Sequence, residues 1–134
     1  INMNTNYVNY KDLIKPDWAP PSWLFGPVWS VLYIIIAISF GYVAYKYFKG
    51  EVSFIILLPF ILNLLFNFIF TPIQFGLKNL PLASLDILLV LITLTWSLVV
   101  IFPIIAWVAY VNIPYLIWVS FATVLQLTIT FLNK

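Results

Sequence analysis

The chain has 134 residues, of which 64% are hydrophobic, 19% aromatic and only 7% charged. Soluble globular domains carry about 25% charged residues, so this chain has too little charge to cover a water-facing surface, and we expect an integral membrane protein. The net charge of +2 does not suggest nucleic-acid binding. The lack of cysteine, histidine and arginine excludes disulfides, histidine-based acid–base or haem chemistry and bidentate carboxylate clamps.

The predicted elements form an all-α, polytopic bundle of four transmembrane helices in a single domain, residues 1–134. A polar lead over residues 1–22 is expected to lie as an irregular lid. Apolar spans follow over about 23–47, 52–75, 81–102 and 103–133. The last boundary falls at Pro103, because proline suits the first turn of a helix and damages its interior. Pro59 and Pro114 are expected to kink the second and fourth helices.

The lysines predict the topology, since cytoplasmic loops carry an excess of basic residues. Four of them fall on the side of the lead, the second loop and the tail, and two on the opposite side. The four are Lys11, Lys15, Lys78 and Lys134, and the two are Lys46 and Lys49. This split favours a cytoplasmic lead and C-terminus.

Polar residues of the second span recur at helical spacing, at Asn63, Asn67, Thr71 and Gln74. Spacings of four, four and three place them on one face, which a membrane helix hides from lipid. The stripe favours hydrogen-bonded packing between helices. A face turned toward a ligand is the alternative, and the two roles can coexist.

Asp86 is the only acidic residue inside a predicted span, about one and a half turns, or roughly 8 Å, into the third helix. A charge at membrane depth is costly and is by default a functional candidate. The alternative is a place at headgroup depth near a helix N-terminus, where the helix dipole favours an acid. Both interpretations stay open, and the polar stripe of the second span is a candidate source of its hydrogen bonds.

Two aromatic stripes follow helical spacing. The first span carries Trp29, Tyr33, Ile36 and Phe40, and the last carries Tyr115, Trp118, Ala122 and Gln126. Such stripes are more often packing than ligand sites. Trp29 and Trp118 nevertheless lie inside predicted spans, away from the interfacial belt where tryptophan is usual, and Ala122 leaves room beside the Trp118 indole.

Four stretches together resemble the tryptophan-rich sensory protein family, also called the translocator-protein family and once the peripheral benzodiazepine receptor. "KPDWAPPSWLFGPVWSVLY" is similar to the family's loop and following helix, and "NLLFNFIFTPIQFGLKN" to the next helix and its exit. "LASLDILLV" resembles the start of the following helix, and "IPYLIWVSFATVLQ" the last one. They occur in the family's order over about residues 7–134. Because family members have five transmembrane helices, the resemblance places a further helix before residue 1.

The resemblance implies a ligand cavity closed by the proline-rich loop. Family members bind porphyrins and related tetrapyrroles, isoquinoline- and benzodiazepine-type drugs and, in animals, cholesterol. The implied ligand-binding residues are Tyr10, Trp29, Tyr33, Asn67, Phe70, Trp118 and Ala122. Pro20 and Pro21 match the lid loop, and Asp86 matches the acid that opens its helix. Asn63 joins them as a structural polar residue.

The leading hypothesis is a membrane protein that binds porphyrin- or tetrapyrrole-type ligands by stacking on indoles and transports, buffers or senses them. No cofactor or metal site is required, and porphyrin or haem is a candidate ligand. The alternative is an enzyme that degrades porphyrin in light with Trp29 and Trp118 as electron donors; otherwise no residue is expected to be catalytic. The expected partners are the lipid bilayer and hydrophobic small molecules such as porphyrins and isoquinoline- or benzodiazepine-type compounds. Nucleic acid is not expected, and a homodimer is left open.

Overall fold

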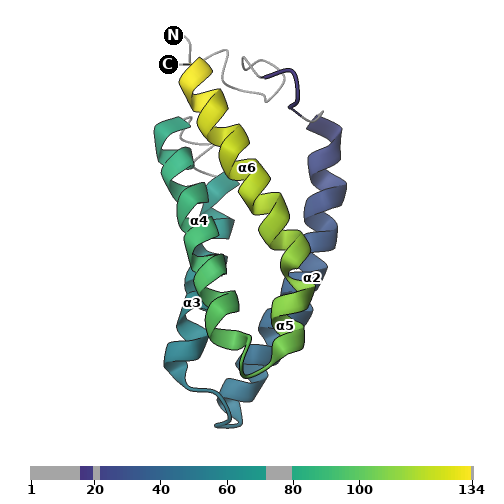
Figure 1. Cartoon of the computed structure of the whole chain (residues 1–134), viewed down its shortest axis with the longest axis vertical. Coiled ribbons are helices and arrows are strands. Elements are labelled where there is room, and N and C mark those ends of the chain that lie inside the picture. The colour runs from purple at the N-terminus through teal and green to yellow at the C-terminus, as the bar shows by residue number, and fades with distance from the viewer. Residues whose placement is uncertain (1–15, 20–21, 72–79, 134) are drawn as a thin grey trace.

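The computed structural model describes residues 16–19, 22–71 and 80–133, and the regular structure in these residues is helical throughout. The helices are α2 (Ser22–Phe48), α3 (Phe54–Thr71), α4 (Leu80–Ile101), α5 (Ala106–Val111) and α6 (Ile113–Leu132) (Figure 1). α2, α4 and α6 are each long and apolar enough to cross a bilayer. α3 is shorter, but its 18 residues span about 27 Å, close to the thickness of the hydrocarbon core. The all-α, multi-pass membrane bundle is therefore confirmed.

α2 ends in a hydrogen-bonded cap at Gly50. The amide of Gly50 donates to the carbonyl of Tyr47 over 2.9 Å, and that of Glu51 donates to the carbonyl of Lys46 over 2.9 Å. This pair of bonds is the Schellman motif, which requires a left-handed residue after the helix, and Gly50 has a φ of 76°. The cap turns the chain sharply into α3, so that α2 and α3 run in opposite directions (Figure 1).

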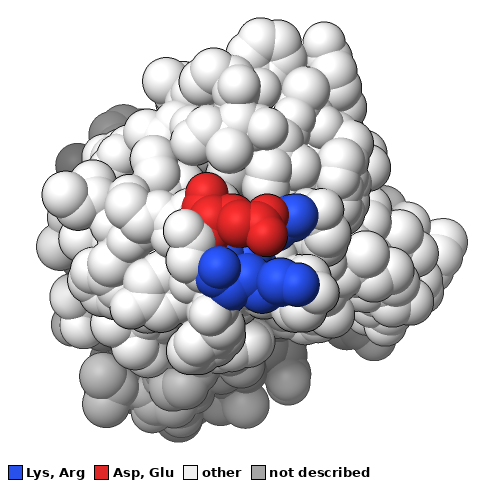
Figure 2. Space-filling model, turned by 90° about the horizontal axis from the view of Figure 1, so that it is seen from below, with Lys and Arg blue, Asp and Glu red and all other residues white. Residues whose placement is uncertain are grey.

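Three charged side chains, Lys46, Lys49 and Glu51, gather at this end of the bundle (Figure 2). Lys46 forms a 2.7 Å ion pair with Glu51 and lies over the Tyr42 ring, and Lys49 lies over the Tyr45 ring. The hydrogen bond from Lys46 and its positive charge hold the pKa of the Glu51 carboxyl below its ordinary value. The side of the membrane that this end faces stays a prediction.

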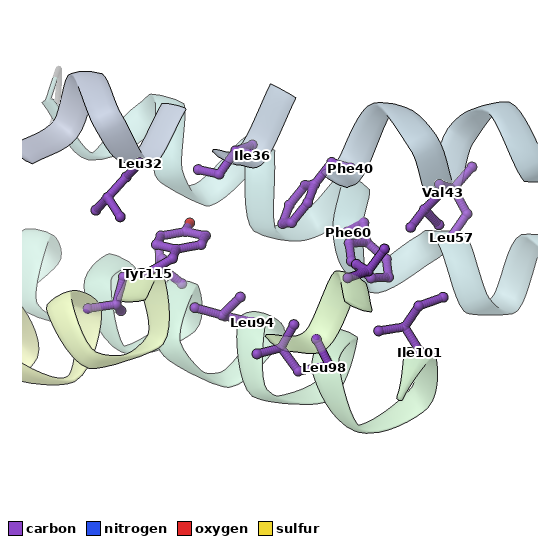
Figure 3. Packing of buried hydrophobic residues seen from close by; sticks show 14 of the residues in the cluster. Leu32, Ile36, Phe40, Val43, Leu57, Phe60, Leu94, Leu98, Ile101 and Tyr115 are labelled. Carbon is purple, nitrogen blue, oxygen red and sulfur yellow. The ribbon is translucent and has the colours of Figure 1, made fainter. Parts of the chain in front are cut away.

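The buried core lies between α2, α3, α4, α5 and the first turns of α6 (Figure 3). Phe40 of α2 and Phe60 of α3 meet edge to face with ring centroids 4.8 Å apart, the geometry that aromatic pairs prefer. Pro59 lies inside α3, which continues beyond it to Thr71. α4 packs against both α3 and α6, which makes it the central helix of the bundle.

The prediction of one long helix from Pro103 to about residue 133 is wrong. α4 ends at Ile101, Pro103 lies in the turn that follows, and the remainder divides into α5 and α6 at Asn112. Nδ2 of Asn112 donates to the carbonyl of Val108 over 2.7 Å and to Oγ of Ser39 over 2.9 Å. The interruption falls here because Pro114 cannot donate to a helix that precedes it, whereas it fits the first turn of α6.

Candidate ligand-binding cavity

A cavity of about 380 Å³ lies between α2, α3, α4 and α6. This volume falls in the range of small-molecule sites, roughly 300–1,000 Å³. Its lining residues are Phe25, Gly26, Trp29, Tyr33, Asn67, Phe70, Ile87, Val90, Trp118, Ala122, Leu125, Gln126 and Ile129. Most of these side chains are apolar or aromatic, so the cavity suits a hydrophobic guest.

α2 contributes an aromatic wall. Phe25, Trp29 and Tyr33 are four residues apart, which places their side chains one above the other on one helix face. The ring centroids of Trp29 and Tyr33 are 5.5 Å apart with the rings tilted by 34°. The α2 wall thus lines the cavity with adjacent aromatic rings.

α6 contributes the second indole. Trp118 packs edge to face on Phe25, with ring centroids 5.8 Å apart, and also contacts Phe121. Its Nε1 is buried and has no hydrogen-bond partner among the residues that the structure describes. Ala122 lies one turn further along α6 and lines the same cavity, so it adds no bulk beside the indole.

Asn67 supplies the amide of the cavity wall. Its Oδ1 accepts a 3.3 Å hydrogen bond from the Tyr33 hydroxyl, and its Nδ2 donates to the Tyr115 hydroxyl over 2.7 Å. Tyr115 is fully buried and does not line the cavity (Figure 3). The Asn67 amide of the cavity wall is therefore hydrogen-bonded to the buried interior of the bundle.

The structure places six of the seven ligand residues implied by the resemblance around this one cavity. They are Trp29, Tyr33, Asn67, Phe70, Trp118 and Ala122. The seventh, Tyr10, and the lid prolines Pro20 and Pro21 lie outside the described residues. Their roles as ligand contacts stay predictions.

Asn63 lies behind the cavity wall. It is fully buried, it does not line the cavity, and it is hydrogen-bonded to Val90, Thr93 and Tyr115. The two asparagines of the α3 stripe therefore differ: Asn63 connects helices, and Asn67 lines the cavity, where its ligand role stays a prediction. The side chains of Thr71 and Gln74 lie outside the described residues.

Asp86 is buried on α4 and is not part of the cavity lining. Its Oδ2 has no hydrogen-bond partner within the described part of the chain. Asn63 and Asn67 direct their amides to Tyr115 and α4 groups other than Asp86, so these two members of the stripe do not supply the bonds considered for the carboxylate.

Sequence reasoning missed part of the lining. Phe25 and Gly26 begin the α2 face, Ile87 and Val90 form the α4 wall, and Leu125 and Ile129 extend the α6 wall beside Gln126, which the stripe of the last span already includes. Phe25 precedes Trp29 by one turn, so extending the α2 stripe by four residues finds it. The α4 residues carry no such signal, because aliphatic side chains occur all along that helix.

The described residues of the lining offer stacking, hydrophobic contact and a few hydrogen bonds. The described residues contain no group of three His, Cys, Asp or Glu side chains that could hold a metal ion. Two indoles, three further aromatic rings and two amides are the distinctive groups of the described wall. Such a wall fits a flat aromatic ligand with few polar groups.

These features define a multi-pass helical membrane protein with an aromatic cavity inside its bundle. The chain belongs to the TspO/MBR family, whose sequence model matches residues 2–132. Among its relatives is the tryptophan-rich protein TspO of Bacillus cereus, 42% identical over 85 residues, which cover 63% of this chain and 54% of that protein.

Two further relatives come from more distant organisms. The human translocator protein is 38% identical over 84 residues, covering 60% of this chain and 48% of the human protein. The tryptophan-rich sensory protein of Cereibacter sphaeroides is 34% identical over 74 residues, covering 55% of this chain and 44% of that protein. The chain thus spans about half the length of the curated relatives it matches.

Proposed function

We propose that the cavity binds porphyrin- or tetrapyrrole-type ligands and that the protein transports, buffers or senses them. The observation that carries this proposal is the pair of indoles, Trp29 on α2 and Trp118 on α6, on the walls of a single cavity within a membrane bundle. A tetrapyrrole offers a broad π-face, and aromatic rings gain about 0.5–1.5 kcal/mol from offset or edge contacts beyond their burial. Smaller isoquinoline- or benzodiazepine-type molecules use the same surfaces.

Stacking rather than iron ligation is the expected mode of binding. The chain contains no histidine or cysteine, and Asn67 is the amide that faces the cavity from α3. The Tyr33 hydroxyl is occupied by its hydrogen bond to Asn67. A ligand that relies on its ring faces is therefore favoured over one that needs an axial protein ligand.

An enzymatic role is the alternative. Trp29 lies beside two tyrosines, with centroid distances of 5.5 Å to Tyr33 and 6.3 Å to Tyr115. Such a cluster of oxidisable rings next to a photosensitive ligand supports light-dependent porphyrin breakdown with Trp29 and Trp118 as electron donors. Binding is common to both functions, so it is tested first.

The binding experiment is a titration of the protein in lipid nanodiscs with protoporphyrin, followed by quenching of tryptophan fluorescence and by porphyrin absorbance. We expect Trp29→Ala and Trp118→Ala each to raise the Kd by about 2- to 10-fold or more, because one stacked ring and its burial are lost. Gly26→Leu should also block binding. Gly26 lines the cavity and has no atom within 4 Å of an added Cβ, so a leucine there adds bulk at the cavity wall while both indoles remain.

Trp96→Ala is the matched control, because Trp96 is exposed on α4 and does not line the cavity. Empty nanodiscs correct for porphyrin that partitions into lipid. Unchanged affinity in all three cavity variants, or an equal loss in Trp96→Ala, would show that porphyrin binds elsewhere.

A further inference from the structure

We propose that Gln126 of α6 forms a second polar site in the cavity, which takes the carboxylic-acid or lactam edge of a flat ligand. Both groups carry a hydrogen-bond donor and an acceptor side by side, and a primary amide offers the complementary pair. The inference rests on the proposed function, because it concerns the ligand of the same cavity. It follows from the bonds that Gln126 makes and from those that it leaves unused.

Gln126 is a buried amide on the wall of the cavity and is only 6% exposed. Trp118, Ala122 and Gln126 follow one another at intervals of four residues, which places them on one face of α6. At 1.5 Å of rise per residue, Gln126 lies about 12 Å beyond Trp118 along the helix axis. A flat ring that rests on the small Ala122 therefore has the indole beside one edge and the Gln126 amide beside the opposite edge.

Thr130 and Ser84 hold one side of this amide. The Thr130 hydroxyl donates to the carbonyl of Leu80 over 3.3 Å, and a carbonyl can only accept. The Thr130 oxygen is then left to accept a 2.6 Å bond from the Ser84 hydroxyl and a 3.4 Å bond from Nε2 of Gln126. These contacts between α4 and α6 turn Nε2 toward Thr130, so Ser84 and Thr130 are positioning residues for the amide.

The Gln126 amide keeps a donor and an acceptor unused. Nε2 carries two N–H groups, and Thr130 accepts from one of them. Oε1 accepts no hydrogen bond from the described residues. Because a buried polar group without a partner is unfavourable, a ligand that supplies both a donor and an acceptor is favoured here.

The other polar groups of the described lining do not offer this pair. The Tyr33 hydroxyl donates to Oδ1 of Asn67, and Nδ2 of Asn67 donates to Tyr115. Nε1 of Trp118 has no partner among the described residues, but an indole N–H can only donate. A ligand with a lone acceptor can therefore bond to Trp118, whereas an adjacent donor and acceptor match Gln126.

Matched ring pairs test the site. Isoquinolin-1-one carries a lactam N–H beside its carbonyl, and its N-methyl derivative keeps the carbonyl but has no donor. Protoporphyrin carries propionic acid side chains, and its dimethyl ester has no free carboxyl group. Binding to the protein in nanodiscs is measured by ligand-detected saturation-transfer NMR for the small rings and by absorbance for the porphyrins. Partition into empty nanodiscs is subtracted, and the affinity ratio within each pair isolates the polar edge from ring stacking.

In the parent protein we expect the lactam to bind about 3- to 10-fold more tightly than its N-methyl derivative. Gln126→Leu keeps a side chain of similar size but removes both hydrogen-bonding groups, so this ratio should fall toward unity. Thr130→Val removes the anchor of the amide and should lower the ratio in the same direction. The affinity for the N-methyl derivative should change less than the affinity for the lactam in both variants.

Thr128→Val is the matched control for Thr130→Val. The Thr128 hydroxyl donates to the carbonyl of Val124 in its own helix over 2.8 Å, and Thr128 does not line the cavity. This variant should keep the parent ratio. Thr130→Val also carries the test if Gln126→Leu does not fold.

The porphyrin pair shows which chemical group occupies the site. If the preference for protoporphyrin over its ester falls in Gln126→Leu, the site takes carboxylic acids. If only the lactam ratio falls, it takes lactams. Ratios of both pairs that persist in Gln126→Leu and Thr130→Val overturn the site at Gln126. If none of the probes binds the parent, the proposed ligand cavity itself fails, which is a different result from binding that does not depend on Gln126.

Discussion

Asn63 and Asn67 are one helical turn apart on α3, yet their amides meet different surroundings. Asn63 bonds to groups of α4 and α6, whereas Asn67 bridges the buried Tyr115 and the cavity residue Tyr33. In a bilayer an amide is retained where it finds partners on other helices. Asn63 therefore links α3 to α4 and α6, one helical turn away from Asn67, which lines the cavity.

The first stability prediction concerns Asn63. Asn63→Leu should lower the free energy of unfolding by about 1–2 kcal/mol, because it leaves the buried Tyr115 hydroxyl without its acceptor. The measurement is unfolding by SDS in mixed micelles, followed by tryptophan fluorescence. Combining Asn63→Leu with Tyr115→Phe should cost less than the sum of the two single changes, since they remove the same bond. Strict additivity would show that the bond contributes nothing.

The sequence predicts part of this arrangement at the residue scale. The i, i+4 spacing places both asparagines on one face of α3, and aromatic spacing finds Trp29, Tyr33 and Trp118. The division of labour between the asparagines depends on Tyr115, which is 52 residues away from Asn63 along the chain. Helical periodicity does not say which groups of other helices a face will meet, so the hydrogen-bond chain could not be predicted.

At the scale of the helix, the end of α2 offers a second stability prediction. Gly50→Ala should destabilise the protein by about 1–2 kcal/mol, because a side chain is disfavoured at the positive φ of 76°. No atom lies within 4 Å of the added Cβ, so the effect comes from the backbone conformation and not from a clash. The same SDS unfolding assay measures it.

Gly41→Ala is the matched control for Gly50→Ala. Gly41 lies inside α2, is exposed and likewise has no atom within 4 Å of an added Cβ. Since alanine favours a helix over glycine by up to about 1 kcal/mol, this change should be neutral or stabilising. If Gly50→Ala lowers the free energy of unfolding and Gly41→Ala does not, the helix cap is the cause. Equal losses in the two variants would contradict this explanation.

Pro103 and Pro114 show where helix prediction succeeds and fails. Pro103 does lie just beyond the end of α4, at Ile101. The region from there to residue 133 is nevertheless divided, because Asn112 precedes Pro114 and the proline occupies the first turn of α6. Asparagine at the N-cap with proline in the first turn is a helix-start signal. Uniform hydropathy and the absence of charge between Asp86 and Lys134 conceal this signal when spans are chosen by length.

At the scale of the whole molecule, the cavity and the charged cluster of Lys46, Lys49 and Glu51 lie at opposite ends of the bundle. The lining residues come from the first part of α2, the last part of α3, the first part of α4 and α6 from Trp118 to Ile129, whereas the charged cluster surrounds the α2–α3 turn (Figures 1 and 2). A ligand in the cavity therefore contacts aromatic and amide groups in one half of the membrane. None of the described lining residues is charged.

This separation matters for the choice between binding and catalysis. The described residues of the cavity lining include no acidic or basic side chain, so none of them offers a carboxylate or an amine for acid–base chemistry. Oxidisable rings remain, and Trp29 has Tyr33 and Tyr115 as neighbours. Photochemical breakdown of a bound porphyrin would therefore depend on indole oxidation, whereas binding depends only on ring surface.

The last prediction separates the two functions. In Trp29→Phe combined with Trp118→Phe, two aromatic faces remain on the cavity walls, so porphyrin should still bind, with a Kd raised by no more than about 10-fold. Illumination of the bound complex at equal occupancy, followed by loss of porphyrin absorbance, then measures the contribution of the indoles. If tryptophan donates electrons, the double variant should bleach far more slowly than the parent, because phenylalanine is much harder to oxidise. Trp96→Phe, outside the cavity, should bleach like the parent. Equal bleaching in the parent and the double variant would exclude tryptophan-assisted breakdown and leave a binding protein. We expect this outcome, because stacking requires only that the rings be present. Catalysis also requires that oxidation of the indoles be faster than the photochemistry of porphyrin without protein.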